Sequence, residues 1–275
     1  METPVMFRDP RILLTTDTKY IDVNSMKKIS YNDLPFYLPD SLHGRNGDWY
    51  EDDQKEQYYL KRRQFVVIIL NEILGVYLSW HMGLDTIEYS LAYDRDNIIG
   101  LFSKNFRKEN IDYVYYHNLP EKEKRFIEQA ILLRAKKEHA KEYKQQYTDY
   151  IMRNFYANQG DRVLNVLCYQ ENGLMHLGPL FDYELSFMHS EDEFIVDSFI
   201  MNYPVDGKLI NKLKKHDQCF DISIEKILAF NMKDTLERIK GDFGIRIPDE
   251  VEKHYISYDE DRKKLMKQNI KNRKF

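Results

Sequence analysis

Hydrophobic and polar positions divide the chain into a strand-rich first part and a helical second part. In the first part, three short runs are rich in Tyr, Leu and Ile, as β-strands are, and the last two predict a hairpin turning at residues 94–96. These runs are residues 58–63, 86–93 and 97–103. The segment of residues 64–83 is long and largely apolar, and it ends at Gly83, a residue that commonly stops helices. This pattern predicts a buried helix.

The segments around these elements are more polar. Residues 11–23 predict a pair of strands around a polar turn, and residues 37–57 predict a loop or a loose hairpin. The helical part begins with residues 118–157, where Asn118, Pro120 and Glu121 fit the start of a helix. A loop and a hairpin turning at Asn172-Gly173 follow. From Glu191 onward the chain is expected to be mostly helical, with breaks at Pro204, Gly207, Gly241 and Pro248.

Composition and charge exclude several classes of protein. The chain is 43% hydrophobic with 21 Tyr, which is enough for a sizeable core and excludes a disordered protein. Its formal charge of −4 and the lack of a helix-turn-helix pattern give no reason to expect direct nucleic-acid binding. Two cysteines define neither a disulfide framework nor a zinc site. With no signal core and no apolar run that could span a membrane, we expect a soluble, cytoplasmic protein.

The candidate chemistry lies between residues 158 and 187. Asp161 and Asn165 share one loop, and the strand after the hairpin ends in Pro-Leu-Phe-Asp, which delivers Asp182. Phosphoryl transfer needs an orienting carboxylate and hard oxygen ligands for magnesium, and these residue types supply both. Taken alone, the same residues fit a loop Asp, a capping Asn and a turn Asp; the order helix, loop, hairpin and Asp182 favours a site.

A nucleotide-clamping lobe would add a Lys on a strand and a Glu on the next helix. Lys61 and Glu72 fit, because Glu72 interrupts an apolar helix and a buried carboxylate needs a partner. The alternative places Glu72 on a narrow exposed face and leaves Lys61 in solvent. Gly44 and Gly47 precede Lys61 at a distance that suits a loop covering phosphates, although an ordinary polar loop explains them equally well.

These stretches together resemble the HipA-like family of atypical bacterial Ser/Thr protein kinases, including its shorter CtkA-like members. The matching stretches are "DRVLN" (161–165), "PLFDYELSF" (179–187) and the small-lobe pattern from "YYLKRR" to "GLFSKNFR". The resemblance implies an α+β, two-lobed protein-kinase-like fold with a small strand-rich N-lobe and a larger helical C-lobe. It implies ATP and Mg²⁺ as cofactors, and phosphorylation of a Ser or Thr hydroxyl of a protein substrate.

The resemblance also implies the residue roles and the division of the chain. Asp161 would orient the hydroxyl, Asn165 and Asp182 would hold magnesium, Lys61 would bind phosphate and Glu72 would position Lys61. The N-lobe would span residues 1–110 and clamp the nucleotide, and the C-lobe, residues 111–275, would carry the catalytic loop and the metal-binding hairpin. An antitoxin-like or regulatory protein partner is conceivable on the same ground.

Two departures from the family pattern keep an alternative open. Asp161 and Asn165 are four residues apart where the family has five, and Val163 stands near the place of the usual His. With Asn165 aligned first, Gly160 would fall opposite the catalytic Asp. The alternative is therefore a pseudokinase, a nucleotide-binding regulatory or interaction module with little transfer activity. A third class, a helical interaction protein without nucleotide, would show no stabilisation by ATP and magnesium.

Four smaller features have simpler interpretations. The tripeptide in "GDFG" (241–244) predicts a turn, and Cys168 predicts a packed side chain. The basic segment from Arg262 to Phe275 predicts a fraying helix, with an anionic partner as the alternative. The Tyr-rich segment "YVYYHN" (113–118) either faces a partner or closes the small lobe.

Overall fold

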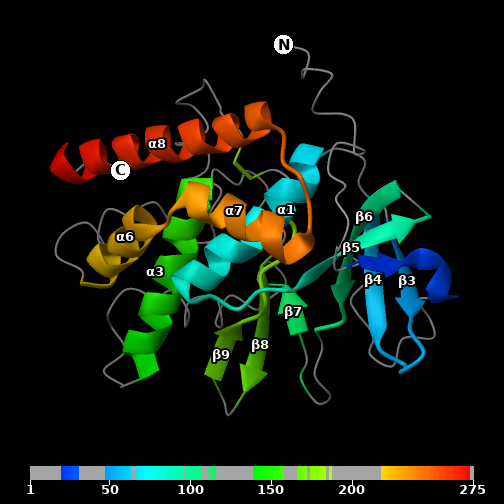
Figure 1. The fold of residues 1–275 in the computed structure, drawn as a ribbon. Helices are drawn as coiled ribbons and strands as arrows, with labels where there is room; N and C mark the ends of the chain where they lie inside the picture. The colour runs from blue at the N-terminus through cyan, green and yellow to red at the C-terminus, as the bar shows by residue number, and fades with distance from the viewer. Residues whose placement is uncertain are drawn as a thin grey trace.

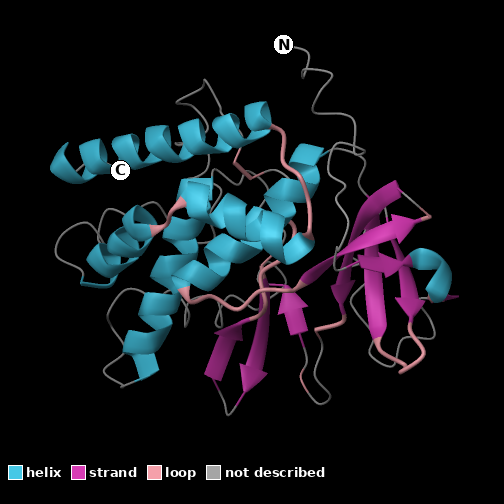
Figure 2. Ribbon diagram, viewed as in Figure 1, coloured by secondary structure: helices cyan, strands magenta, loops and turns pink. Residues whose placement is uncertain are grey.

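The structure, a computed structural model, combines two β-sheets with a group of helices. It describes residues 20–30, 47–62, 66–95, 97–106, 111, 113–115, 139–157, 166–171, 174–183, 186–187 and 218–272. The larger sheet lies at the right of the view, the helices lie at the left and centre, and the smaller sheet lies below the helices with β7 nearest the larger sheet (Figures 1 and 2). This is the α+β arrangement that the sequence predicted.

The larger sheet contains six of the described strands, in the order β1-β5-β6-β4-β3-β2. β1 pairs with β5 in parallel, and the other neighbours are antiparallel. The strands are β1 (Tyr20–Asp22), β2 (Lys27–Ile29), β3 (Gly47–Glu51), β4 (Gln57–Arg62), β5 (Tyr89–Asp94) and β6 (Asn97–Lys104). The β5–β6 hairpin predicted around residues 94–96 is confirmed, as is the strand that carries Lys61. Of the strand pair predicted over residues 11–23, the first part lies outside the described residues.

The smaller sheet joins the two halves of the chain. Its order is β7-β8-β9, with antiparallel pairing throughout, and its strands are β7 (Tyr113–Tyr115), β8 (Leu167–Glu171) and β9 (Leu174–Leu177). β8 and β9 form the hairpin that Asn172-Gly173 predicted. β7 comes directly after the large sheet in sequence yet pairs with this hairpin, so the two halves of the chain meet there.

Five helices of the described chain make up the helical part. They are α1 (Val66–Met82), α3 (His139–Ala157), α6 (Gln218–Ala229), α7 (Met232–Phe243) and α8 (Asp249–Asn272). α1 is the predicted buried helix, and Gly83 follows it with a φ of +77°, a left-handed conformation that suits glycine. α3 matches the second half of the helix predicted over residues 118–157; residues 116–138 lie outside the described part. No helix within the described ranges is long and apolar enough to cross a membrane.

The main hydrophobic core forms around α1. Its side chains are apolar almost all round, and they join side chains of α3, α6, α7 and α8 in one continuous buried cluster. A helix with this pattern is expected to be buried on every side. The large sheet contributes Leu91, Tyr93, Ile98 and Leu101 of β5 and β6 to this cluster, and it has a second, smaller cluster made by Tyr50, Leu60, Ala92 and Phe102. The helix expected to serve the small lobe is therefore packed in one core with the other helices and with two strands of the large sheet.

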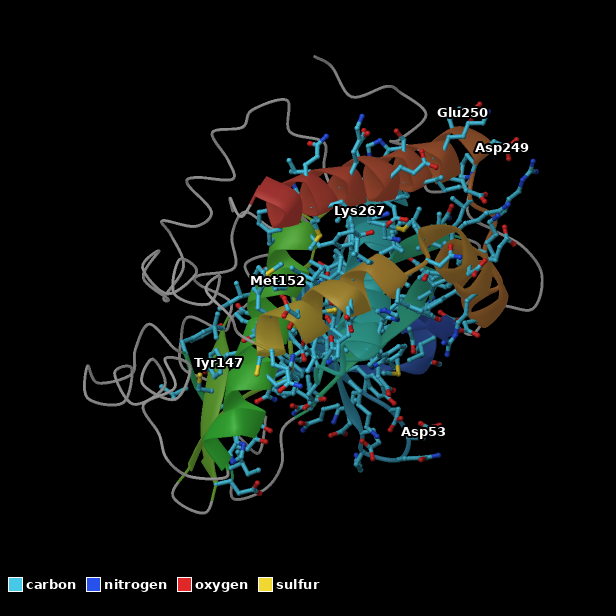
Figure 3. The ribbon with its side chains drawn as sticks, turned by 90° about the vertical axis from the view of Figure 1, so that its left-hand side faces the viewer. Asp53, Tyr147, Met152, Asp249, Glu250 and Lys267 are labelled. Atoms are coloured by element: carbon cyan, nitrogen blue, oxygen red, sulfur yellow. The ribbon has the colours of Figure 1, made fainter. Side chains whose placement is uncertain are left out.

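The last helix crosses the outside of the helical part. Figure 3 shows Lys267 on α8 above Met152 on α3, with Asp249 and Glu250 at the first turn of α8. In the same view Asp53, in the turn between β3 and β4, lies at the bottom, at the opposite end of the molecule from α8. The boundary predicted near residue 110 falls between β6 and β7, and it stays a prediction.

Two predictions about the last part of the chain are wrong. Gly241 does not break a helix; it lies inside α7, which ends at Phe243, with Gly244 in the left-handed conformation and its N–H bonded to the Lys240 carbonyl. The "GDFG" segment is thus the end of a helix rather than a turn alone, and Asp242 accepts a hydrogen bond from the Tyr77 hydroxyl. Pro248 does separate two helices, as predicted.

The basic segment from Arg262 is helical as far as Asn272, as predicted, and it is held at its start. The Arg262 guanidinium donates to the backbone carbonyls of Phe155 and Tyr156. The Lys263 ammonium donates to the carbonyl of Phe230. Charged side chains that satisfy helix-terminal carbonyls in this way fix one helix on another.

Candidate active site

Three charged side chains from distant parts of the chain meet between the large sheet and α1. The Lys61 ammonium, on β4, donates to Oε1 of Glu72 on α1 and to Oδ1 of Asp182, which follows the β8–β9 hairpin. The Glu72 side chain is fully buried, and the side chains of Lys61 and Asp182 are 11% and 25% exposed. The expected pairing of Lys61 with Glu72 is thus present, and Asp182 joins the same ammonium.

Glu72 is satisfied on both of its carboxylate oxygens. Besides the ammonium on Oε1, its Oε2 accepts from the Tyr89 hydroxyl and from the backbone N–H of Tyr183, both at 2.8 Å. A buried carboxylate costs folding free energy unless it is paired and hydrogen-bonded, and Glu72 meets both conditions. Through this single side chain, β4, α1, β5 and the segment that carries Asp182 are joined.

The Asp182 segment is shaped by its backbone and by one bridge to the small lobe. Asp182 has a φ of +63°, in the left-handed region that Asp tolerates better than most residues. Leu180 pairs in parallel with Thr86: the Leu180 N–H donates to the Asp85 carbonyl, and the Ile87 N–H donates to the Leu180 carbonyl. This bridge fixes the segment just before the turn at Asp182.

Two buried tyrosines border the charged cluster. Burial, and then the charge of Glu72, raise the pKa of Tyr89 well above its usual range, so its hydroxyl stays a neutral donor. Burial also raises the pKa of Tyr115, with a further contribution from the Asp182 carboxylate. Tyr115 ends β7 and is 3% exposed. The strand that joins the lobes therefore brings an aromatic side chain within electrostatic reach of Asp182.

The loop of Asp161 and Asn165 lies outside the described residues, but its two ends are defined. α3 ends at Ala157, and the described chain resumes at Val166, directly before β8. Distant residues donate hydrogen bonds to the backbone carbonyls at the end of α3. The Tyr156 carbonyl accepts from the Arg262 guanidinium and the Tyr258 hydroxyl, and the Ala157 carbonyl accepts from the N–H of Phe187 at 2.7 Å. The loop thus starts from an anchored helix end and returns into the hairpin that leads to Asp182.

Of the two glycines expected to cover phosphates, the structure describes only Gly47. Gly44 lies outside the described residues. Gly47 is the first residue of β3, and its register partner on β4 is Lys61. Gly47 therefore lies in the sheet, next to the lysine strand, rather than in a loop.

The residues present fit a magnesium–nucleotide complex, although no described group forms a metal site by itself. Nowhere in the described ranges do three His, Cys, Asp or Glu side chains gather as a metal site. Magnesium is commonly held by one or two carboxylates together with substrate phosphates. Asp182 offers a partly exposed carboxylate beside an ammonium that could meet a phosphate, which is the donor set such a complex needs.

Sequence reasoning missed Tyr89, Tyr115 and Tyr183 as neighbours of the cluster. The signals were present but weak: Tyr89 lies in the predicted β5 strand, and Tyr115 lies in a Tyr-rich segment expected either to face a partner or to close the small lobe. Tyr183 directly follows Asp182. The long-range folding that brings them to Glu72 and Asp182 is not encoded in local spacing.

The fold is α+β, and comparison with solved structures shows it to be kinase-like. No protein-family model matches the chain, and no curated protein matches it in sequence. Among solved structures, the chain is similar to the proinflammatory kinase CtkA of Helicobacter pylori, with a TM-score of 0.54, 15% identity, and coverage of 79% of this chain and 90% of CtkA.

A second structure, HipA in a toxin–antitoxin complex of Shewanella oneidensis with HipB and operator DNA, matches with a TM-score of 0.41 and 11% identity, over 93% of this chain and 73% of HipA. At such identities the likeness to CtkA establishes the fold and nothing finer, and it agrees with the kinase-like fold expected from the sequence.

Proposed function

We propose that this protein is an ATP- and magnesium-dependent kinase that transfers phosphate to a Ser or Thr hydroxyl of a protein. The observation that carries the proposal is the cluster of Lys61, Glu72 and Asp182, buried between a strand, a helix and the segment after a hairpin. In a kinase-like fold, these are the elements from which a phosphate-binding cation and a metal-binding carboxylate come.

In the proposed site, Lys61 binds phosphate and Glu72 holds Lys61 in place. An ammonium has three donors, so Lys61 can keep Glu72 and still donate to a phosphate oxygen. Asp182, with Asn165 of the preceding loop, would hold magnesium, which when bound neutralises charge on the transferred phosphoryl group. Gly44 would belong to the segment proposed to cover the phosphates, and Gly47 begins the strand β3 beside Lys61.

Asp161 would orient the substrate hydroxyl for attack on the γ-phosphorus. The new bond joins the hydroxyl oxygen to that phosphorus while the bond to the β–γ bridging oxygen breaks, which releases ADP. The hydroxyl proton passes to the Asp161 carboxylate. The residues of this chain thus bind, orient and accept a proton, and positioning with electrostatic stabilisation accounts for most of the acceleration in such reactions.

The second candidate is a pseudokinase that binds nucleotide as a regulatory or interaction module. The shortened spacing between Asp161 and Asn165 favours it, because a carboxylate out of reach of the hydroxyl leaves binding intact and slows transfer. The presence of Lys61, Glu72, Asn165 and Asp182 together favours the kinase.

The test is transfer from γ-labelled ATP with magnesium, using wild type, Asp161→Asn and Asp182→Asn. A kinase labels itself or an added protein such as casein, and both variants lose the label. Glu237→Gln, an exposed carboxylate on α7, serves as the matched control and keeps it. Absence of transfer, with magnesium-dependent ATP binding lost only in Asp182→Asn, would select the pseudokinase. Absence of any ATP binding would contradict both functions.

A protein substrate is part of this proposal, and an antitoxin-like or regulatory partner is a separate expectation from the sequence resemblance. Co-purification of tagged protein from its native cells, with and without ATP, tests for such a partner. A partner that is itself phosphorylated by wild type and not by Asp182→Asn would be a substrate.

A further inference from the structure

Tyr183, the residue after Asp182, is seated against the backbone of α1. Its side chain is fully buried, and it lies so close to Gly75 that there is no room for a larger residue. A Cβ atom added to Gly75 would come to 2.6 Å from Cβ and Cδ2 of Tyr183, and closer still to Cγ. Real Cβ atoms do not approach other atoms this closely, so any side chain at position 75 would displace the ring.

The far end of the same ring is fixed by hydrogen bonds. The Tyr183 hydroxyl lies 2.6 Å from Oγ1 of Thr86 and 3.2 Å from Oγ of Ser79. Oγ1 of Thr86 also donates to the Leu180 carbonyl at 2.9 Å. The hydroxyl end of Tyr183 is thus tied to the bridge that holds the chain just before Asp182.

A buried cation lies over the face of the Tyr183 ring. The Arg153 guanidinium lies 4.3 Å from the ring centroid and also donates to the Gly75 carbonyl at 3.2 Å. Arg153 is fully buried on α3, four residues before the end of that helix. The ring is therefore packed from α1, from α3 and from the segment before β5.

Because Tyr183 is fixed on all these sides, the backbone of Asp182 is fixed as well. The Tyr183 N–H donates to Glu72, and the adjoining residue, Asp182, holds its left-handed φ of +63°. Because Cβ of Tyr183 itself lies 2.6 Å from an atom added to Gly75, rotation of the ring cannot relieve this contact, and the Tyr183 backbone has to move together with the adjoining Asp182. Outer contacts of this kind orient metal ligands in proteins.

We propose that Tyr183, seated on Gly75 and anchored by Thr86, is a positioning residue that sets the Asp182 carboxylate for magnesium. The inference rests on the proposed function, since it assigns a role within the same site. If Tyr183 has this role, disturbing its contact with Gly75 changes the magnesium concentration needed for ATP binding more than it changes the affinity for ATP without metal.

The first experiment compares wild type, Gly75→Ala and Gly241→Ala. Gly241 is the matched control, because it also lies within a helix and an added Cβ there meets nothing within 4 Å. ATP binding is measured by calorimetry in EDTA and over a magnesium titration, with circular dichroism to establish folding. We expect the magnesium concentration for half-maximal ATP binding to rise about tenfold or more in Gly75→Ala and to stay unchanged in Gly241→Ala.

A second variant tests the same role in case the Gly75→Ala protein does not fold. Tyr183→Phe keeps the ring and removes only the hydroxyl contacts to Thr86 and Ser79, and we expect a rise in the magnesium requirement of about threefold or more, smaller than for Gly75→Ala. Affinity for ATP in EDTA stays unchanged in both variants. A merely structural role would lower stability and leave the magnesium requirement at the wild-type value.

The outcomes separate the two proposals. Folded variants that need no more magnesium than wild type overturn the positioning role and leave the proposed function intact. A wild-type protein without magnesium-dependent ATP binding overturns the proposed function, and the positioning role with it. A raised magnesium requirement with unchanged metal-free affinity supports both.

Discussion

Replacing Glu72 by Gln tests whether the buried cluster depends on the charge of this residue. The substitution keeps the size and shape of the side chain, which is fully buried, and removes one negative charge. The carboxylate now accepts from the Lys61 ammonium, the Tyr89 hydroxyl and the Tyr183 N–H. An amide has only one acceptor oxygen, and its NH₂ group would face one of these donors.

The expected loss of stability follows from these contacts. One existing donor loses its acceptor and the new NH₂ group is buried without one, and each such loss costs about 1–3 kcal/mol. The full cost of isolating a buried charge does not arise, because Lys61 keeps Asp182 as a partner. We therefore expect a loss of about 3 kcal/mol in the free energy of unfolding, which is a decrease in Tm of roughly 6–12 °C for a protein of this size.

The assay is urea unfolding at 25 °C followed by circular dichroism, for wild type, Glu72→Gln and Glu237→Gln. Glu237 makes a surface ion pair with Lys240 and has a 57% exposed side chain, so its variant controls for the chemistry of the substitution. The midpoint for Glu72→Gln should fall with an unchanged dependence on urea, while the control stays at wild type. Equal midpoints for the two variants would refute the idea that Glu72 is a charge-dependent centre of the fold.

Three further predictions concern other parts of the structure. Gly244→Ala should lose about 1 kcal/mol in urea unfolding, because the residue has a left-handed φ of +57°, whereas Gly241→Ala inside α7 should gain about 0.5–1 kcal/mol; equal effects would contradict this. Arg262→Gln should lose about 2 kcal/mol in the same assay, because its guanidinium binds two carbonyls at the end of α3, and the exposed Lys264→Gln should not change. Burial raises the pKa of the Cys168 thiol from about 9 to about 12, so the contribution of this thiol to stability is complete below pH 9 and is lost as the pH rises toward 12. At pH 8, Cys168 of the native protein should therefore resist iodoacetamide until the protein is unfolded in urea. Rapid labelling of Cys168 in the native protein would contradict its burial.

Much of the fold could be predicted because its signals are local. The apolar run that became α1, its stop at Gly83 and the turn of the β8–β9 hairpin each lie within a few residues of the signal that predicts them. The pairing of Lys61 with Glu72 was accessible for a different reason: a carboxylate inside an apolar helix has to find a cation. The local pattern could not show that Asp182 would join the same ammonium.

What the sequence did not reveal depends on contacts between distant segments. The N–H of Tyr183 reaches Glu72 across 111 residues, and no periodicity encodes that contact. Gly241 and Gly244 look alike as helix stops, and the hydrogen bond from the Gly244 N–H to Lys240 decides between them. Arg262 appeared to belong to a fraying tail because its partners lie at the end of α3, more than a hundred residues away.

The packing of α1 has a consequence for how this site can change in time. α1 shares one continuous core with α3, α6, α7 and α8, so withdrawing Glu72 by swinging this helix would expose that whole core to water. In the β-sheet that carries Lys61, β5 and β6 share this core through Leu91, Tyr93, Ile98 and Leu101, whereas the buried residues of β3 and β4 belong only to the small cluster, so these two strands are the cheaper part to displace. Amide hydrogen exchange should therefore be slowest along α1, at the rate of global unfolding, and faster in β3 and β4. Any control of the site would act through the movement of Lys61 toward a stationary glutamate, with the helix as the fixed reference.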